Sequence, residues 1–244
     1  MLKYVLFDLD GTMLPMDQDK FIKIYFTELS NRFCPIFKLE DEQLIKAVWK
    51  ATNSMVKNDG SRPNRLAFWE TFSKILGNGV LKYVKDFDDF YMNEFNECKA
   101  ATKFNPLVPE IIKTLKNKGY TLIAATNPLF PEAAIKNRMG WAGVKPGDFE
   151  LVASYENFST SKPNPKYFTE IAEKIKAEAE QCLMVGNDID EDILPSAQVG
   201  MDAYVLTDCL VNRSDADYSE YKQGSMRELL NYARMLPDVK IQEF

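Results

Sequence analysis

Five short apolar runs, separated by segments with helical spacing, constrain the fold of this chain more than any other feature. They lie at residues 4–7, 120–125, 151–154, 182–185 and 203–206. The runs show no strict alternation of apolar and polar positions, which is typical of strands buried on both faces of a parallel sheet. Helical patterns over 109–118 and 168–175 precede two of these runs. This alternation predicts a doubly wound α/β core.

Residues 16–100 have a different, wholly helical pattern. Apolar side chains recur at helical spacing from Ile22 to Phe33 and again from Leu44 to Met55. Further helices are predicted over 63–76 and 81–96, on either side of a glycine-containing turn. We therefore predict an all-helical cap domain at 16–100 and a core domain formed by 1–15 plus 101–244. The alternative is that these helices simply pack on the sheet.

Histidine is absent from the 244 residues, and this absence removes several kinds of chemistry. Ser-His-Asp and Cys-His schemes, histidine-ligated zinc and phosphohistidine chemistry all require that side chain. The four cysteines are scattered, so they are predicted to be small buried apolar residues. Catalysis would depend on carboxylates, lysine, hydroxyl groups, amides and a hard metal ion.

Charge and hydropathy limit the partners of this chain. A net charge of −6 disfavours nucleic acid as the main partner. It still allows a small phosphorylated substrate, because a bound cation can reverse the local field. No apolar run approaches the length of a membrane span, and the first residues lack a signal-peptide pattern. We expect a cytoplasmic protein with no membrane partner.

Two carboxylates follow the first predicted strand in the sequence D-L-D-G-T at 8–12. Ligands of open α/β sheets bind beyond the carboxyl ends of the strands, so Asp8 and Asp10 are well placed for chemistry. One carboxylate can attack phosphorus while the other transfers protons. Gly11 allows a sharp turn and a close approach to a ligand. The alternative is an acidic turn without function.

Two later segments supply groups suited to a phosphate. Thr126 and Asn127 end the second predicted strand, where a hydroxyl and an amide can donate hydrogen bonds to phosphoryl oxygens. Lys162 begins the sequence K-P-N-P-K-Y-F, in which Pro165 suits a first helical turn. Lys162 would then lie in the preceding loop, free to reach the acids and the phosphate.

An acidic cluster follows the predicted strand at 182–185. It contains Asn187, Asp188 and Asp192, together with Asp190 and Glu191. Carboxylates gathered at a strand end repel one another unless a cation lies among them. Acids at the start of a helix also interact favourably with its dipole, and this explanation is sufficient for Asp190 and Glu191.

These four segments, in this order, resemble the haloacid dehalogenase-like hydrolases. The resemblance spans residues 5–201 and implies that Asp8 is the nucleophile and Asp10 the general acid and base. It implies that Thr126, Asn127 and Lys162 contact the phosphate. It also implies Mg²⁺ as the cofactor, held by Asp8, the Asp10 carbonyl group and one residue of the acidic cluster.

The fourth motif departs from the common form of the family, which reads G-D-S-x-x-x-D. Here Asn187 occupies the position of the first aspartate, and Asp188 follows it. We expect Asp188 to ligate the metal, with Asn187 and Asp192 in supporting roles.

The resemblance predicts a Mg²⁺-dependent phosphatase that hydrolyses a small phosphorylated metabolite through an aspartyl-phosphate. Asp10 argues against dehalogenation, because dehalogenating relatives lack this second aspartate. A sugar-phosphate mutase remains an alternative on the same core, and so does an inactive binding or regulatory protein.

The predicted cap offers candidates for substrate selection. Arg62 could meet a second anionic group and Asn64 a hydroxyl group, although the loop at 58–64 also has the composition of a solvated turn. Trp49 and Trp69 lie within apolar helical patterns and are predicted to be core residues.

Overall fold

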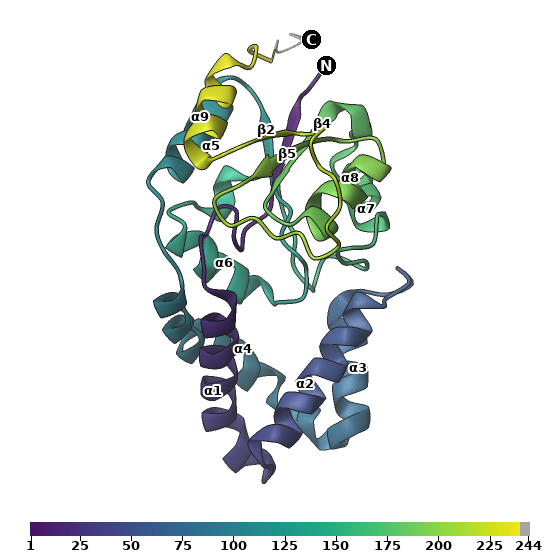
Figure 1. The fold of residues 1–244 in the computed structure, drawn as a ribbon. Coiled ribbons are helices and arrows are strands. Elements are labelled where there is room, and N and C mark those ends of the chain that lie inside the picture. The colour runs from purple at the N-terminus through teal and green to yellow at the C-terminus, as the bar shows by residue number, and fades with distance from the viewer. Residues whose placement is uncertain (240–244) are drawn as a thin grey trace.

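A six-stranded parallel sheet forms the centre of the computed structural model, which describes residues 1–239 (Figure 1). The strand order is β3-β2-β1-β4-β5-β6. The strands are β1 (Tyr4–Phe7), β2 (Thr121–Ala124), β3 (Leu151–Val152), β4 (Cys182–Gly186), β5 (Asp202–Leu206) and β6 (Lys222–Gly224). The five predicted strands and the doubly wound α/β class are confirmed. The sixth strand, with the sequence K-Q-G, has no apolar run by which it could be recognised.

Helices cover both faces of the sheet (Figure 1). Val5 and Phe7 of β1 belong to a cluster that also contains apolar side chains of α5 (Leu107–Asn117), α6 (Glu132–Trp141) and α9 (Met226–Met235). Leu6, between them in sequence, packs instead with Phe168 and Ile171 of α7 (Lys166–Ile175). Side chains of a strand alternate between the two faces, so an apolar run without alternation produces a core on each side.

The segment between β1 and α5 is helical, as predicted. Its helices are α1 (Gln18–Phe37), α2 (Asp41–Val56), α3 (Asn64–Leu76) and α4 (Val84–Met92), with 3₁₀ turns η1 (Asn78–Tyr83) and η2 (Glu94–Ala101). The continuous helix predicted over 81–96 is wrong, because only its middle is α-helical. Asn93 leaves helical geometry at φ −115° and ψ −87°. Its side chain and that of Asn96 donate to nearby backbone carbonyl groups, which competes with the helical pattern.

The remaining elements are short. They are η3 (Pro146–Asp148), η4 (Ala179–Gln181), the single π-helical turn η5 (Ile189–Ile193) and α8 (Leu194–Gln198). Within residues 1–239, no helix combines the length and the apolar character needed to cross a membrane.

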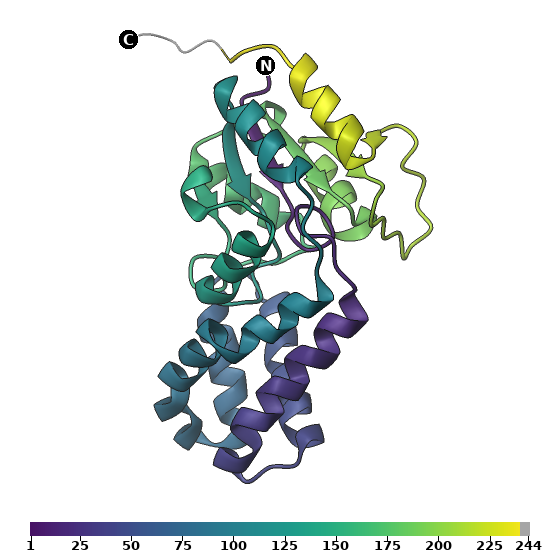
Figure 2. The same ribbon diagram turned by 90° about the vertical axis from the view of Figure 1, so that its left-hand side faces the viewer.

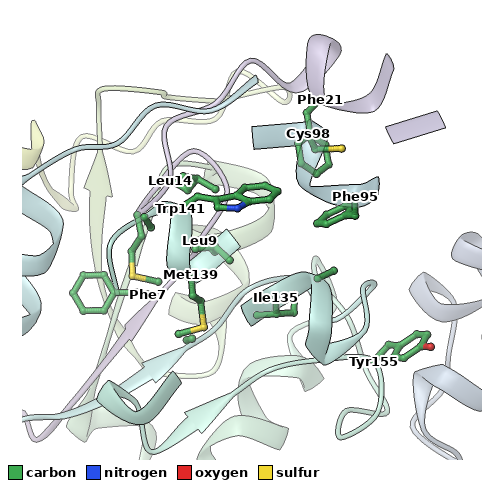
Figure 3. Close-up of a cluster of buried hydrophobic side chains, with 14 of the residues drawn as sticks. Phe7, Leu9, Leu14, Phe21, Phe95, Cys98, Ile135, Met139, Trp141 and Tyr155 are labelled. Atoms are coloured by element: carbon green, nitrogen blue, oxygen red, sulfur yellow. The ribbon is translucent and has the colours of Figure 1, made fainter. Parts of the chain in front are cut away.

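The helices of residues 18–101 stand beyond the carboxyl ends of the strands (Figure 2). An apolar interior continues from the sheet into this segment. Phe95 of η2 stacks on Trp141 of α6 with ring centroids 5.7 Å apart, and Leu9 and Leu14 of the turn after β1 lie near them (Figure 3). The carboxyl ends of β1, β2 and β4 therefore face the helical segment.

Candidate active site

The predicted site residues come together where the order of the strands reverses. β1 lies between β2 and β4 in the sheet. The strands β2 and β3 follow on one side of β1, and the strands β4, β5 and β6 follow on the other side. Asp8 directly follows β1, Thr126 lies two residues beyond β2, and Asn187 directly follows β4. A switch point of this kind opens a crevice at the carboxyl ends of a parallel sheet.

A buried lysine joins two aspartates at this point. Lys162 Nζ lies 2.8 Å from Asp8 Oδ1 and 2.6 Å from Asp192 Oδ1. The lysine is only 1% exposed, and so is Asp192. No hydrogen bond within residues 1–239 involves the second oxygen of Asp8, so this oxygen is available to a ligand. The sequence predicted that Lys162 reaches the acids, and the geometry agrees.

The charges of this triad are coupled. Burial by itself lowers the pKa of Lys162, but the adjacent carboxylates of Asp192 and Asp8 outweigh burial and raise that pKa above its usual value. Burial raises the pKa of Asp192, and Lys162 opposes this shift. The raised pKa of Lys162 and the raised pKa of Asp192 are consistent with each other, because a single ammonium group is shared by two carboxylates. With both carboxylates ionised the triad would carry an excess negative charge, which a proton on Asp192 or a nearby cation would offset.

The turn after β1 is built around a glycine and an asparagine. Gly11 has φ +89°, and a Cβ atom there would lie 2.5 Å from Asn187 Nδ2. The Thr12 hydroxyl group donates to Asn187 Oδ1 at 2.8 Å, and Asn187 Nδ2 donates to the Cys209 carbonyl group at 2.8 Å. Asn187 therefore ties the turn after β1 to the end of β4 and to the loop that contains Cys209. An aspartate could not donate the second of these bonds.

Asp10 has a partner that the sequence analysis missed. Its carboxylate forms an ion pair with Arg138 of α6, which is 1% exposed. The guanidinium group also lies 4.6 Å from the centre of the Phe130 ring. Burial raises the pKa of Asp10, Arg138 opposes the shift, and Asp8 adds to it. A carboxyl group with a raised pKa, two residues from a carboxylate held by lysine, is suited to proton transfer.

Asp188 takes part in two interactions at the end of β4. Its Oδ1 accepts from the backbone of Asp190 and Glu191 at 3.0 Å each. Its Oδ2 lies 2.8 Å from Arg213, a residue whose side chain is 56% exposed. The acids at 190 and 191 therefore do begin a helical turn, which Asp188 caps. The guanidinium group therefore places a positive charge beside the carboxylate that was expected to ligate a metal.

The oxygen groups at this site suit a hard metal ion, although side chains alone would not complete its shell. Within the described residues, no three acidic, cysteine or histidine side chains gather closely enough to hold a metal. The free oxygen of Asp8, the backbone carbonyl group of Asp10 and the carboxylate of Asp188 supply the oxygen chemistry that Mg²⁺ prefers. Magnesium sites in proteins characteristically retain water and phosphate ligands, so this sparse set fits the ion.

Thr126 and Asn127 follow β2, which flanks β1 on the side opposite β4. Thr126 is buried, and its carbonyl group accepts from Tyr167 at 2.7 Å. Asn127 Nδ2 donates to Glu191 at 3.2 Å, while its Oδ1 is buried and has no partner within residues 1–239. Burial raises the pKa of Glu191, Lys162 opposes the shift, and Asp188 adds to it. Glu191 therefore does more than begin a helical turn, the role that the sequence suggested.

The structure contradicts the expectation placed on one of the two cap candidates, Asn64. Asn64 is fully buried, and its Nδ2 has acceptors in Pro128, Thr160 and Ser161 at 3.0 to 3.3 Å. A substrate hydroxyl group has no access to it, so the predicted substrate role is wrong. Asn64 instead joins the start of α3 to the loop that carries Lys162. Arg62 lies 3.5 Å from Glu70, exposed and away from the cavity described next.

A cavity of about 310 Å³ lies between the helical segment and the sheet. Asp10, Asn127 and Glu191 line it on the side of the site. Most of the remaining wall is aromatic, with rings from α1, α2, α3 and α4. Trp49 and Trp69 both belong to this wall. Trp69 is buried as predicted, but Trp49 is 48% exposed, so the prediction that it is a core residue is wrong.

Three functional candidates gave too weak a signal in the sequence. Arg138 occupies a polar position in an ordinary helix, Arg213 lies in a long loop, and Glu191 resembled a helix-start acid. Arg138 pairs with a residue 128 positions away. No local pattern encodes such a pair, because sequence periodicity reports only the burial of a face.

The fold and the site together define a doubly wound α/β protein with a carboxylate–lysine centre at the switch point of its sheet. This chain belongs to the haloacid dehalogenase-like hydrolases. The model of that hydrolase family matches residues 2–200.

Individual relatives cover from about half of this chain to nearly all of it. It is 26% identical to a glyceraldehyde 3-phosphate phosphatase from Methanocaldococcus jannaschii, over 97% of this chain and 99% of that protein. It is 29% identical to a phosphoglycolate phosphatase from Aquifex aeolicus, over 54% of this chain and 64% of that protein. A crystal structure of a HAD phosphatase from Thermococcus onnurineus has a TM-score of 0.61 at 19% identity, covering 98% of this chain and all of that one. This last similarity concerns the fold.

Proposed function

We propose that this protein is a Mg²⁺-dependent phosphatase that hydrolyses a small phosphate monoester through an aspartyl-phosphate on Asp8. The observation that carries the proposal is the buried Lys162, which holds one oxygen of Asp8 at 2.8 Å and leaves the other oxygen without a partner. A carboxylate fixed in this way is an oriented nucleophile. Two relatives with phosphatase names support the same chemistry.

The first half-reaction transfers the phosphoryl group. The free oxygen of Asp8 attacks phosphorus, and the bond from phosphorus to the leaving alcohol oxygen breaks. Asp10 gives its proton to that oxygen, and its raised pKa favours the protonated form that this step requires. Lys162 and the groups after β2 offset negative charge on the phosphoryl oxygens.

The second half-reaction restores the enzyme. Asp10, now ionised, takes a proton from a water molecule. The hydroxide oxygen of that water attacks phosphorus. The bond between phosphorus and Asp8 breaks, which releases inorganic phosphate. Arg138 holds the Asp10 carboxylate close to the reacting atoms in both half-reactions.

Magnesium would be held by Asp8, the Asp10 carbonyl group and Asp188, with Asn187 and Asp192 in supporting positions. When bound, it supplies charge neutralisation at a phosphoryl oxygen. The balance of side-chain charge supports a divalent cation, because five carboxyl groups face three cationic groups. The acids are Asp8, Asp10, Asp188, Glu191 and Asp192, and the cations are Arg138, Lys162 and Arg213.

We further propose that residues 16–100 form a cap domain over a core of 1–15 plus 101–244. The helical segment leaves the core through short connections on either side of residues 16 and 102, which pair as an isolated bridge. It also supplies most of the cavity wall beside Asp10. Substrate selection would then belong to the cap, and chemistry to the core.

The test is detection of the intermediate. The protein is mixed with a ³²P-labelled aryl phosphate and Mg²⁺ and quenched in acid, and the labelled protein is treated with neutral hydroxylamine, which cleaves acyl phosphates. We expect hydroxylamine-sensitive label on wild type and on Glu173→Gln, an exposed control, but none on Asp8→Asn. Phosphate release that is insensitive to a chelator, or label that persists in Asp8→Asn, contradicts the proposal. Accumulation of an isomeric phosphate instead of free phosphate would identify a mutase.

A further inference from the structure

The cavity beside Asp10 has an aromatic wall assembled from four helices. Phe26 of α1 faces Trp49 of α2 with ring centroids 5.4 Å apart. Phe68 and Trp69 of α3 lie edge to face at 5.5 Å. All four rings line the cavity. Its volume of about 310 Å³ lies at the lower end of the range of about 300–1,000 Å³ that is typical of small-molecule sites.

Some polar groups in this wall bond to one another, whereas Trp69 Nε1 and Asn127 Oδ1 are buried and have no hydrogen-bond partner within residues 1–239. Tyr25 and Tyr91 bond to each other through their hydroxyl groups at 2.9 Å. Among the residues that the structure describes, the charged ones that line the cavity are Asp10 and Glu191, and no lysine or arginine lines it. Asp10 is already paired with Arg138, which lies behind the wall and is 1% exposed.

This distribution disfavours a substrate with a second anionic group. A carboxylate or second phosphate placed in the cavity would lose its hydration and would find two acids but, among residues 1–239, no lysine or arginine in the cavity lining. Arg138 has one nitrogen without a partner, but it is 1% exposed and does not line the cavity. Removing a charge from water without a partner costs several kcal/mol or more. Arg62, which the sequence suggested for a second anionic group, pairs with Glu70 and does not line the cavity.

The apolar wall reaches the protein surface. Ile22 and Trp49 both line the cavity, and their exposed fractions are 37% and 48%. They come from α1 and α2, which stand on opposite sides of the helical segment (Figure 1). A large exposed tryptophan beside a hollow is characteristic of a binding surface rather than of a core.

We infer that the leaving group of the substrate is an uncharged alcohol carrying an aromatic or similarly flat apolar ring, and not a short acid or a second phosphate. This inference rests on the proposed phosphatase activity, because it assigns the cavity next to Asp10 to the alcohol side of the scissile bond. The ring lies among Phe26, Trp49 and Trp69, while its ester oxygen faces Asp10. Stacking on the aromatic rings and burial of the ring then supply the binding energy. In a substrate with a second anionic group, an ion pair would supply it.

The test compares benzyl phosphate with phosphoglycolate and glyceraldehyde 3-phosphate as substrates in the presence of Mg²⁺. We expect kcat/KM to be at least about tenfold higher for benzyl phosphate, a ratio typical of the difference between filling an apolar pocket and leaving it unfilled. Trp49→Ala should lower kcat/KM for benzyl phosphate by about tenfold and leave phosphoglycolate nearly unchanged. Leu66→Ala is the matched control, since Leu66 is 51% exposed on α3 and does not line the cavity. Thr52→Arg, which adds a cation to the wall, should raise kcat/KM for phosphoglycolate.

The outcomes separate the two proposals. Hydrolysis that depends on Mg²⁺ but favours phosphoglycolate or glyceraldehyde 3-phosphate overturns the ring inference and leaves the phosphatase intact. Absence of hydrolysis for all three compounds overturns the phosphatase. In that case the cavity is still tested by tryptophan fluorescence of Asp8→Asn, since Trp49 and Trp69 line it. Saturable quenching by benzyl phosphate and not by phosphoglycolate supports the inference, and the reverse order of affinity overturns it.

Discussion

Replacement of Lys162 by methionine tests the buried charge triad most directly. The substitution keeps an unbranched side chain of similar length but removes the ammonium group between Asp8 and Asp192. These contacts are 2.8 and 2.6 Å long, and the side chains of Lys162 and Asp192 are each 1% exposed. Removing one partner of a buried ion pair costs about 3–5 kcal/mol, because the remaining charge has no partner. For a chain of this length that corresponds to a decrease in Tm of about 6–20 °C.

The loss should depend on pH in a defined direction. Burial already raises the pKa of Asp192 above its unfolded value, and loss of the ammonium group should raise it further. Between the unfolded and folded pKa values, the folded state binds more protons than the unfolded state, so stability falls as pH rises through that interval. Lys162→Met should therefore lose less stability at pH 5 than at pH 8.

Thermal unfolding by circular dichroism at pH 5 and pH 8 measures both effects. Lys166→Met is the control, because Lys166 is exposed at the start of α7 and should shift Tm little. The double variant with Asp192→Asn should recover part of the loss, since it removes one of the two stranded carboxylates. A Tm for Lys162→Met within about 2 °C of wild type at pH 8, or a loss independent of pH, would refute the reasoning, since about 1 kcal/mol or less would then be at stake.

Three further predictions concern the partners that the structure revealed. In steady-state assays, Arg138→Met should lower kcat by about 10²-fold for an alkyl phosphate and much less for p-nitrophenyl phosphate. The reason is that only the poorer leaving group needs the proton of Asp10. Equal losses for the two substrates would contradict this. Arg213→Gln should lower the Mg²⁺ concentration that gives half-maximal activity, because the guanidinium group 2.8 Å from Asp188 competes with the ion; a higher requirement would show that Arg213 orients the carboxylate. Asn64→Ala should lower the free energy of unfolding by about 2–3 kcal/mol through lost buried hydrogen bonds, with KM unchanged; a changed KM with normal stability in urea titrations would contradict the structural role.

Much of the fold could be predicted because its determinants are local. Buried parallel strands require uninterrupted apolar runs, and five of these runs coincide with strands. The exceptions also have local causes. The sequence K-Q-G of β6 carries no apolar signal, and the predicted helix over 81–96 ends where Asn93 and Asn96 bond to nearby backbone. These side-chain amides compete with the backbone hydrogen bonds of the helix, and the spacing of apolar residues in the sequence does not reveal such competition.

The site divides in the same way. Asp8 and Asp10 can be recognised in the sequence because they lie between an apolar strand and a glycine turn, all within a few adjacent residues. Lys162 can be recognised because a characteristic proline pattern follows it directly. The assignments of Asn64 and Trp49 were wrong because burial in a helix or loop depends on what packs against it. Asn64 is bonded to the loop before Lys162, whereas the Trp49 ring packs against Phe26 but is 48% exposed.

The sequence by itself determined the order of strands and helices, the acidic turn after β1 and the absence of histidine chemistry. Only the tertiary structure decided which charge meets which. Arg138 reaches Asp10 across 128 positions, and Lys162 reaches Asp8 across 154. It also decided that the wall beside Asp10 is largely aromatic and that, within residues 1–239, no lysine or arginine lines it. The physical reason is that backbone preference acts over a few residues, whereas ion pairing and cavity shape depend on distances between elements that the sheet brings together.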